Sequence, residues 1–275
     1  MQDLTTGKEG KLIFGFAAPM LLGNVFQQLF SVVDSIIVGN FIGKEALAAV
    51  GASFPIIFMM VSLIVGLVMG TTVVISQYFG AKDFDRVKRA IDTMYIFSAG
   101  AGIITTILGL LLAEPLLRLL GLPVEIMPQA TTYLRIYFSG MIIFFGYNGT
   151  SAVLRGLGDS KTPLYFLIIA TVANIILVLL FVGVFKWGVA GAAYATLLAN
   201  GLAFGLAIIW LNKTHKLIRI AVTGLYFDRE IFRQSAGLAL SCGQAHRLHS
   251  WTAAVWAHNV IMSPSSPACP GRERP

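Results

Sequence analysis

The sequence predicts an all-α membrane protein, a bundle of six transmembrane helices. Of its 275 residues, 56% are hydrophobic and only 12% are charged, whereas about a quarter are charged in soluble domains. The charged residues leave six long gaps, and about twenty mainly apolar residues suffice for a helix that crosses the bilayer. The gaps are residues 12–39, 46–77, 93–113, 134–154, 163–185 and 189–212. They make residues 1–212 the predicted membrane domain.

The first predicted span, 12–39, holds one ionisable side chain, Asp34, in mainly apolar sequence. Its polar residues recur every three or four positions, so they share one face of a helix. They are Asn24, Gln27, Gln28, Ser31, Asp34 and Ser35. Such a stripe is typical of a helix with lipid on its outer surface and a cavity at its inner face. We therefore expect Asp34 to face a cavity that the stripe lines. The alternative is that Asp34 only reaches the lipid headgroups.

Proline interrupts the first two spans. Pro19 removes a backbone donor from the first span, and the carbonyl that it would have served belongs to Gly15, whose missing side chain leaves room for a bend. Pro55 has a similar effect in the second span. Pro19 is the candidate hinge, although an inert kink is compatible with the same sequence.

Basic residues lie mostly on alternate connections between the spans. One side has Lys8, Lys11, Lys82, Arg86, Lys88, Arg89, Arg155, Lys161, Lys213, Lys216 and Arg219, and the other has Lys44, Arg118, Arg135 and Lys186. Cytoplasmic loops carry the excess of lysine and arginine. We therefore expect a multi-pass protein of the cell (inner) membrane with a cytoplasmic N-terminus. This distribution accounts for the net charge of +7 without a nucleic-acid surface.

Two connecting regions have their own character. Residues 155–163 predict a tight cytoplasmic turn, in which glycines permit the reversal and Asp159 caps the next helix. Residues 213–241 predict an amphipathic helix on the cytoplasmic face, followed by the start of a further apolar helix. From residue 242 onward the composition is that of a disordered tail.

The embedded residues predict neither an enzyme nor a metal or cofactor site. Intramembrane catalysis generally needs paired carboxylates, an activated nucleophile or clustered histidines. Asp34 has no second embedded acid, and every histidine lies outside the spans. The histidines are His215, His246, His249 and His258.

Four stretches stand out in order and spacing: residues 30–39 (FSVVDSIIVG), 46–51 (ALAAVG), 76–81 (SQYFGA) and 155–163 (RGLGDSKTP). Together they resemble the multidrug and toxic compound extrusion (MATE) family of membrane antiporters, over residues 10 to about 240. The resemblance implies a twelve-helix transporter of two six-helix lobes. Such a transporter exports drugs or other cationic or amphipathic compounds in exchange for protons or sodium ions.

The same resemblance assigns roles to individual residues. It implies that Asp34 is the first-helix carboxylate that couples transport to a cation, and that Asn174 is a polar partner facing it. Asn148, in the fourth span, is a further candidate for the cavity lining. Some members carry a second carboxylate one turn after the asparagine, where this chain has Val178. The choice between proton and sodium coupling therefore stays open.

Only one lobe is present, and the sequence departs from the family pattern where a seventh helix would begin. We expect a half-transporter that lacks its second lobe, through truncation, a frameshift or an incomplete gene model, or as a natural half-transporter. Two alternatives are a non-transporting fragment and a flippase of lipid-linked substrates from the same superfamily. Such a flippase would usually have several basic residues in its cavity, and Arg135 is the only basic candidate here.

Overall fold

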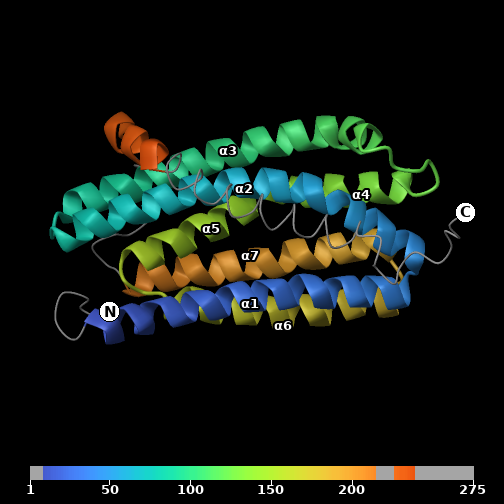
Figure 1. Cartoon of the computed structure of the whole chain (residues 1–275), viewed down its shortest axis with the longest axis horizontal. Coiled ribbons are helices and arrows are strands. Elements are labelled where there is room, and N and C mark those ends of the chain that lie inside the picture. Colours follow the sequence, from blue (N-terminus) through green and yellow to red (C-terminus); the bar gives the residue numbers. More distant parts are fainter. Residues whose placement is uncertain (1–8, 215–225, 239–275) are drawn as a thin grey trace, which may run out of the picture.

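The computed structural model describes residues 9–214 and 226–238, and the regular structure of this part is helical throughout. The helices lie along one long axis, so the molecule is an elongated all-α bundle (Figure 1). They are α1 (Glu9–Phe41), α2 (Lys44–Gly80), α3 (Phe84–Leu119), α4 (Met127–Ser139), α5 (Met141–Gly156), α6 (Lys161–Val178), the π-helical η1 (Leu179–Val184) and α7 (Gly188–Thr214). The connections α1–α2, α3–α4 and η1–α7 gather at one end, which we call the distal end. The N-terminus marks the opposite, amino-terminal end (Figure 1).

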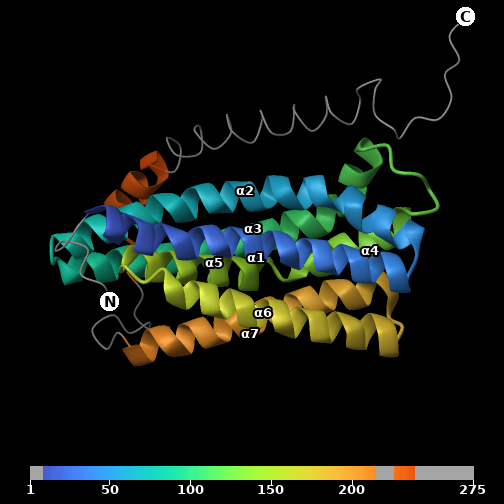
Figure 2. The ribbon, with the colours of Figure 1, turned by 60° about the horizontal axis from the view of Figure 1, so that its bottom comes forward.

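The membrane character of the bundle follows from the length and composition of its helices. Within the described residues, five helices are long and apolar enough to cross a bilayer. The shorter α4 and α5 follow one another from the distal to the amino-terminal end, and together they supply a further pass (Figures 1 and 2). The predicted all-α membrane bundle is confirmed.

The predicted span 134–154 differs from expectation because it is divided between two helices. α4 begins at Met127 and ends before Gly140, and α5 starts directly after this glycine. A β-carbon at residue 140 would collide with the side chain of Leu197 on α7. The close approach of α7 therefore explains why the corner has glycine. An isolated glycine in apolar sequence gave no sign of the break, because transmembrane helices often contain glycine.

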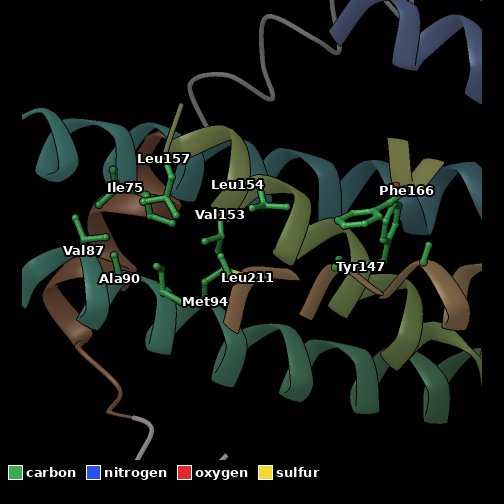
Figure 3. Close-up of a cluster of buried hydrophobic side chains, with 14 of the residues drawn as sticks. Ile75, Val87, Ala90, Met94, Tyr147, Val153, Leu154, Leu157, Phe166 and Leu211 are labelled. Atoms are coloured by element: carbon green, nitrogen blue, oxygen red, sulfur yellow. The ribbon is translucent and has the colours of Figure 1, made fainter. Parts of the chain in front are cut away.

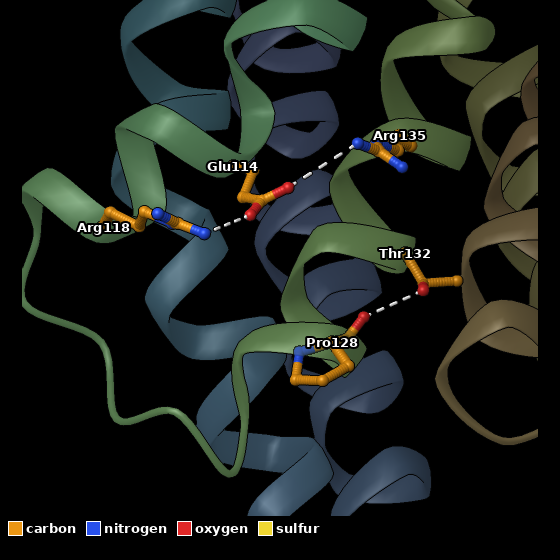
Figure 4. A network of polar contacts seen from close by, with 5 residues as sticks. All are labelled: Glu114, Arg118, Pro128, Thr132 and Arg135. Carbon is orange, nitrogen blue, oxygen red and sulfur yellow. Dashed lines mark hydrogen bonds and ion pairs between the residues drawn. The ribbon is translucent and has the colours of Figure 1, made fainter.

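α3 is longer than the predicted span 93–113 and carries charge at both ends. At its distal end, Glu114 binds Arg118 at 2.7 Å and reaches Arg135 of α4 at 3.8 Å (Figure 4). These side chains are exposed, so each pair contributes about 0–1 kcal/mol at most. Glu114 thus draws Arg135 of α4 toward α3, where Arg118 binds the same carboxylate. One turn nearer the start of α4, the Thr132 hydroxyl donates to the Pro128 carbonyl at 2.8 Å (Figure 4).

The largest apolar cluster fills the amino-terminal half of the bundle (Figure 3). Ile75 of α2, Met94 of α3, Leu154 of α5 and Leu211 of α7 are among its buried members. In a membrane, packing of this kind stabilises through close contact, because lipid tails are as apolar as the side chains. The cluster holds the helices together on the amino-terminal side of the site described next.

Residues 226–238 pack against the amino-terminal end of α3, and 229–238 are helical (orange-red in Figure 1). The Thr93 hydroxyl of α3 accepts a hydrogen bond from the backbone N–H of Asp228 at 3.0 Å. The Asp228 carboxylate in turn caps the short helix by accepting from the N–H of Glu230 at 3.0 Å. The rings of Phe97 and Phe232 lie 5.1 Å apart.

These contacts bear on the predicted linker 213–241 only in part. The apolar positions of its expected amphipathic helix, Leu217, Ile220 and Ala221, lie outside the described residues, as does the whole of 242–275. Ile231 is buried in the same apolar cluster as Leu211 of α7. The chain after α7 therefore returns to the bundle at α3.

Candidate functional site

Asp34 lies in the distal half of α1 and points into the bundle. Asp34 is only 7% exposed, and its Oδ1 atom is buried without a hydrogen-bond partner. α1 packs mainly against α6 (Figure 1). Two of its neighbours on α1, Ile37 and Val38, are buried in an apolar cluster with residues of α4, α6 and α7. A carboxylate in such surroundings has lost most of its water, which disfavours its charged form.

The rest of the polar stripe takes a different position. Asn24, Gln27 and Gln28 lie nearer the amino-terminal end of α1 and are exposed on the surface of the lobe. Ser35 is half-buried, and Ser31 occupies the same helix. The stripe therefore divides into an inward carboxylate and an outward polar surface. This outward surface is available to line a cavity only if something else closes over it.

Two tyrosines of α4 lie near the carboxylate, and neither was singled out from the sequence. Tyr133 is buried in the same apolar cluster as Ile37 and Val38, which lie one turn along α1 from Asp34. Tyr133 is 5% exposed, and the two rings lie 6.3 Å apart. The four-residue spacing of these tyrosines was the only available signal, and aromatic residues at that spacing usually pack in a core.

Asn174 of α6 is buried and joined to α7. Its residue is 1% exposed, and its Nδ2 atom donates a hydrogen bond to the Thr196 hydroxyl at 3.3 Å. Asn200 of α7 donates to the Thr196 carbonyl at 2.8 Å. Within the part of the chain that the structure describes, the side-chain hydrogen bond of Asn174 goes to Thr196 and not to Asp34. Val178, at the position of a second acid in some relatives, is fully buried in the apolar cluster that also contains Tyr133.

The remaining predicted site residues lie apart from this group. Asn148 of α5 donates to the Phe144 carbonyl of its own helix at 2.8 Å, so its amide nitrogen is already engaged. α1 continues as a helix through Pro19. The structure thus brings Asp34 together with two tyrosines, and it places Asn174 with Thr196 on the adjoining helices.

A groove of about 500 Å³ opens between α1 and α2, with Ser35, Asn40 and Lys44 as its polar lining. Its residues on α1 lie on the face opposite Asp34, since positions 32, 36 and 39 are turned about half a helical turn away from it. The groove and the buried carboxylate are therefore separate features.

Asp34 offers carboxylate oxygens to a ligand. Carboxylate, hydroxyl and amide oxygens suit a proton or a hard cation, whereas zinc sites are built from histidine and cysteine. In the described ranges no group of three or more His, Cys, Asp or Glu side chains could hold a metal ion. Buried acids in membrane helices commonly mark ion pathways and proton relays, which makes Asp34 the candidate residue for such a role.

Comparison with known proteins places the chain in a clear context. The family model MatE matches residues 19–180. The "Probable multidrug resistance protein YpnP" of Bacillus subtilis is 41% identical over 220 residues, which cover 80% of this chain and 49% of that protein. The "Probable multidrug resistance protein YoeA" of the same species is 37% identical, covering 72% of this chain and 44% of YoeA.

The structural comparison agrees. A MOP superfamily transporter from Pyrococcus furiosus superposes with a TM-score of 0.79 at 30% identity, over 86% of this chain and 53% of that chain. The chain thus spans about half the length of the curated relatives that it matches.

Proposed function

The chain belongs to the MatE family of transporters, and on this basis we propose that it forms one lobe of a cation-driven exporter. The exporter would move drugs or other cationic or amphipathic compounds out of the cell in exchange for inward protons or sodium ions. Family membership confirms the resemblance drawn from the sequence. The relatives' names describe multidrug resistance proteins, which supports this substrate class.

The observation that carries the proposal is the buried, unpaired oxygen of Asp34. A buried carboxylate oxygen without a donor is unfavourable by about 1–3 kcal/mol or more. Binding of a proton or a sodium ion removes that cost, because either one neutralises the charge. Asp34 is therefore the coupling residue of the proposal. Asn174 is its proposed partner, because it lies on α6, the helix against which α1 mainly packs.

Cation binding can be linked to movement of α1. When Asp34 becomes neutral, the cost of burying its charge disappears, and in this proposal the packing of α1 against α6 changes with it. The outward residues Asn24 and Gln28 lie on the same helix, so a shift or bend of α1 at Pro19 would reshape the surface that they form. With Gln27 this surface is the proposed substrate lining, and Ser31 and Asn148 remain proposed lining residues.

Alternating access in two-lobed transporters works by rocking one half against the other around a site between them. The exposed polar surface of α1 would be unfavourable against lipid, which favours its burial against a second lobe. Lipid-linked anionic substrates are less compatible with this lobe. Arg135, the one basic candidate, reaches Glu114 on α3 at 3.8 Å instead of the polar surface of α1.

The proposal is tested by drug export in cells that lack related pumps. We expect the 275-residue chain alone to confer no resistance, and resistance to appear when the second half of YpnP is co-expressed to supply a second lobe. Asp34→Asn should abolish it at matched expression. Resistance from the chain alone as a monomer, or full resistance with Asp34→Asn, would refute the proposal.

A further inference from the structure

We propose that Gln129 of α4 forms an outer subsite for the coupling cation, on the route from the distal end of the bundle to Asp34. The ligand of this subsite would be a small monovalent cation, either sodium or a hydrated proton. The inference rests on the proposed function, in which a cation enters from outside and binds at Asp34. It adds a residue that neither the sequence pattern nor the family resemblance singled out.

The first argument is the hydrogen-bonding state of the Gln129 amide oxygen. Among the described residues, four buried side-chain polar atoms lack a partner: Asp34 Oδ1, Gln129 Oε1, Thr131 Oγ1 and Ser151 Oγ. The last two are hydroxyls, which can both donate and accept. The carbonyl oxygen of Gln129 and the ionised carboxylate of Asp34 can only accept. Two buried acceptors without donors are what a cation would satisfy.

The second argument is the position of Gln129 on its helix. Gln129, Tyr133 and Tyr137 are four residues apart, so they form one line along α4, with about 5–6 Å between successive β-carbons. α4 begins at the distal end with Met127, which makes Gln129 the outermost member of the line. Tyr133 is buried in the same apolar cluster as Ile37 and Val38 of α1, one turn from Asp34. The line that begins at Gln129 therefore leads from the distal end toward the part of α1 that carries Asp34.

The third argument is the charge around this line. The arginine of α4, Arg135, reaches Glu114 on α3 at 3.8 Å, and Arg118 binds the same carboxylate at 2.7 Å (Figure 4). Positions 129 and 135 are about 120° apart around a straight helix. The line therefore contains no basic side chain that would repel an entering cation.

The same surroundings make Gln129 a transit point and not a storage site. Gln129 lies in the first turn of α4, where the helix dipole places partial positive charge, and its side chain is neutral. A cation would therefore be held weakly there. Ion pathways need this property, since an ion must bind well enough to enter and weakly enough to leave.

The experiment measures how fast the purified chain responds to a cation. The probes are sodium chloride against potassium chloride at constant ionic strength and a pH jump, and the signal is intrinsic fluorescence in a stopped-flow instrument. Gln129→Leu removes the acceptor, and we expect it to slow the response by about tenfold, as for loss of one interaction with a charge. Gln129→Glu, which keeps an acceptor, should restore the rate or raise it. Thr132→Val is the matched control, because Thr132 is exposed on α4 and its hydroxyl donates to the Pro128 carbonyl of its own helix.

The outcomes separate this inference from the proposed function. If Asp34→Asn removes the response and Gln129→Leu responds at the rate of the unmodified chain, the outer subsite is wrong and the coupling site stands. If Asp34→Asn responds normally, or the unmodified chain responds to neither probe, both proposals fail. If Gln129→Leu does not fold, Gln129→Asn, which shortens the side chain but keeps the amide, should slow the response, and an unchanged rate would overturn the inference.

Discussion

Asn174 of α6 donates a hydrogen bond to the hydroxyl of Thr196 on α7, with 3.3 Å between Nδ2 and Oγ1. Both residues are buried, so the bond joins two helices where water is absent. α6 is also the helix against which α1 mainly packs. The bond therefore holds α6 and α7 together as the support for α1, the helix that carries Asp34.

Removing the Thr196 hydroxyl should destabilise this support. Hydrogen bonds between membrane helices contribute about 0.6 kcal/mol on average, and a buried donor left unpaired adds to the loss. We expect Thr196→Val to lower the free energy of unfolding by about 1–2 kcal/mol, measured by denaturant titration of the purified chain. Thr132→Val, at an exposed position of α4, should have little effect. Equal stability of both variants would show that the Asn174 bond is unimportant.

The corner between α4 and α5 should not accept a side chain. Gly140→Ala would place its methyl group against Leu197, and overpacking of this kind usually destabilises by about 1–3 kcal/mol. Leu197→Ala in the same chain should recover part of the loss, because it makes room for the methyl group. Thermal unfolding of the two single variants and the double variant measures this. Additive losses would contradict the predicted collision.

Residues 226–238 should be held at α3 in solution. Phe97→Cys with Phe232→Cys, in a chain whose native cysteines are replaced by serine, should be joined by a short thiol crosslinker, since the two rings lie 5.1 Å apart. Thr93→Val removes the acceptor of the Asp228 N–H and should lower the crosslinking yield severalfold. A yield that does not change would mean that the apolar contacts alone hold the segment.

The orientation in the membrane is predicted from the positive-inside rule. Single cysteines at Lys44 and Lys186 should react with a membrane-impermeant thiol reagent from outside intact cells. Cysteines at Arg86 and Lys161 should react only after the membrane is opened. Labelling of either pair from the opposite side would reverse the predicted topology.

The sequence predicted the helical bundle and the acid embedded in its first helix because both depend on local composition. Charge-free segments identify membrane helices directly, and Asp34 is conspicuous within one. The sequence did not single out Tyr133 or Thr196, because their positions beside α1 and Asn174 depend on which helix faces meet.

The same limit applies to the polar stripe of α1. Helical periodicity showed that Asn24, Gln28 and Asp34 share a face, but not that the helix would bury one end of that face and expose the other. The break at Gly140 was hidden for a related reason. Its cause, the side chain of Leu197, is more than fifty residues away along the chain.

The central claim, that Asp34 binds the coupling cation, is tested most directly by cation-dependent stability of the purified chain. A ligand that binds the folded state stabilises it by about 2.7 kcal/mol at one hundred times its Kd. The measurement is Tm during a sodium titration at constant ionic strength and during a pH titration without sodium. Gln28→Leu, on the exposed face of the same helix, is the matched control.

We predict that Tm of the unmodified chain and of Gln28→Leu shifts with sodium, with pH or with both, and that Asp34→Asn loses the shift produced by the coupling ion. An Asp34→Asn chain that folds and shows the full shift of the unmodified chain would contradict the account.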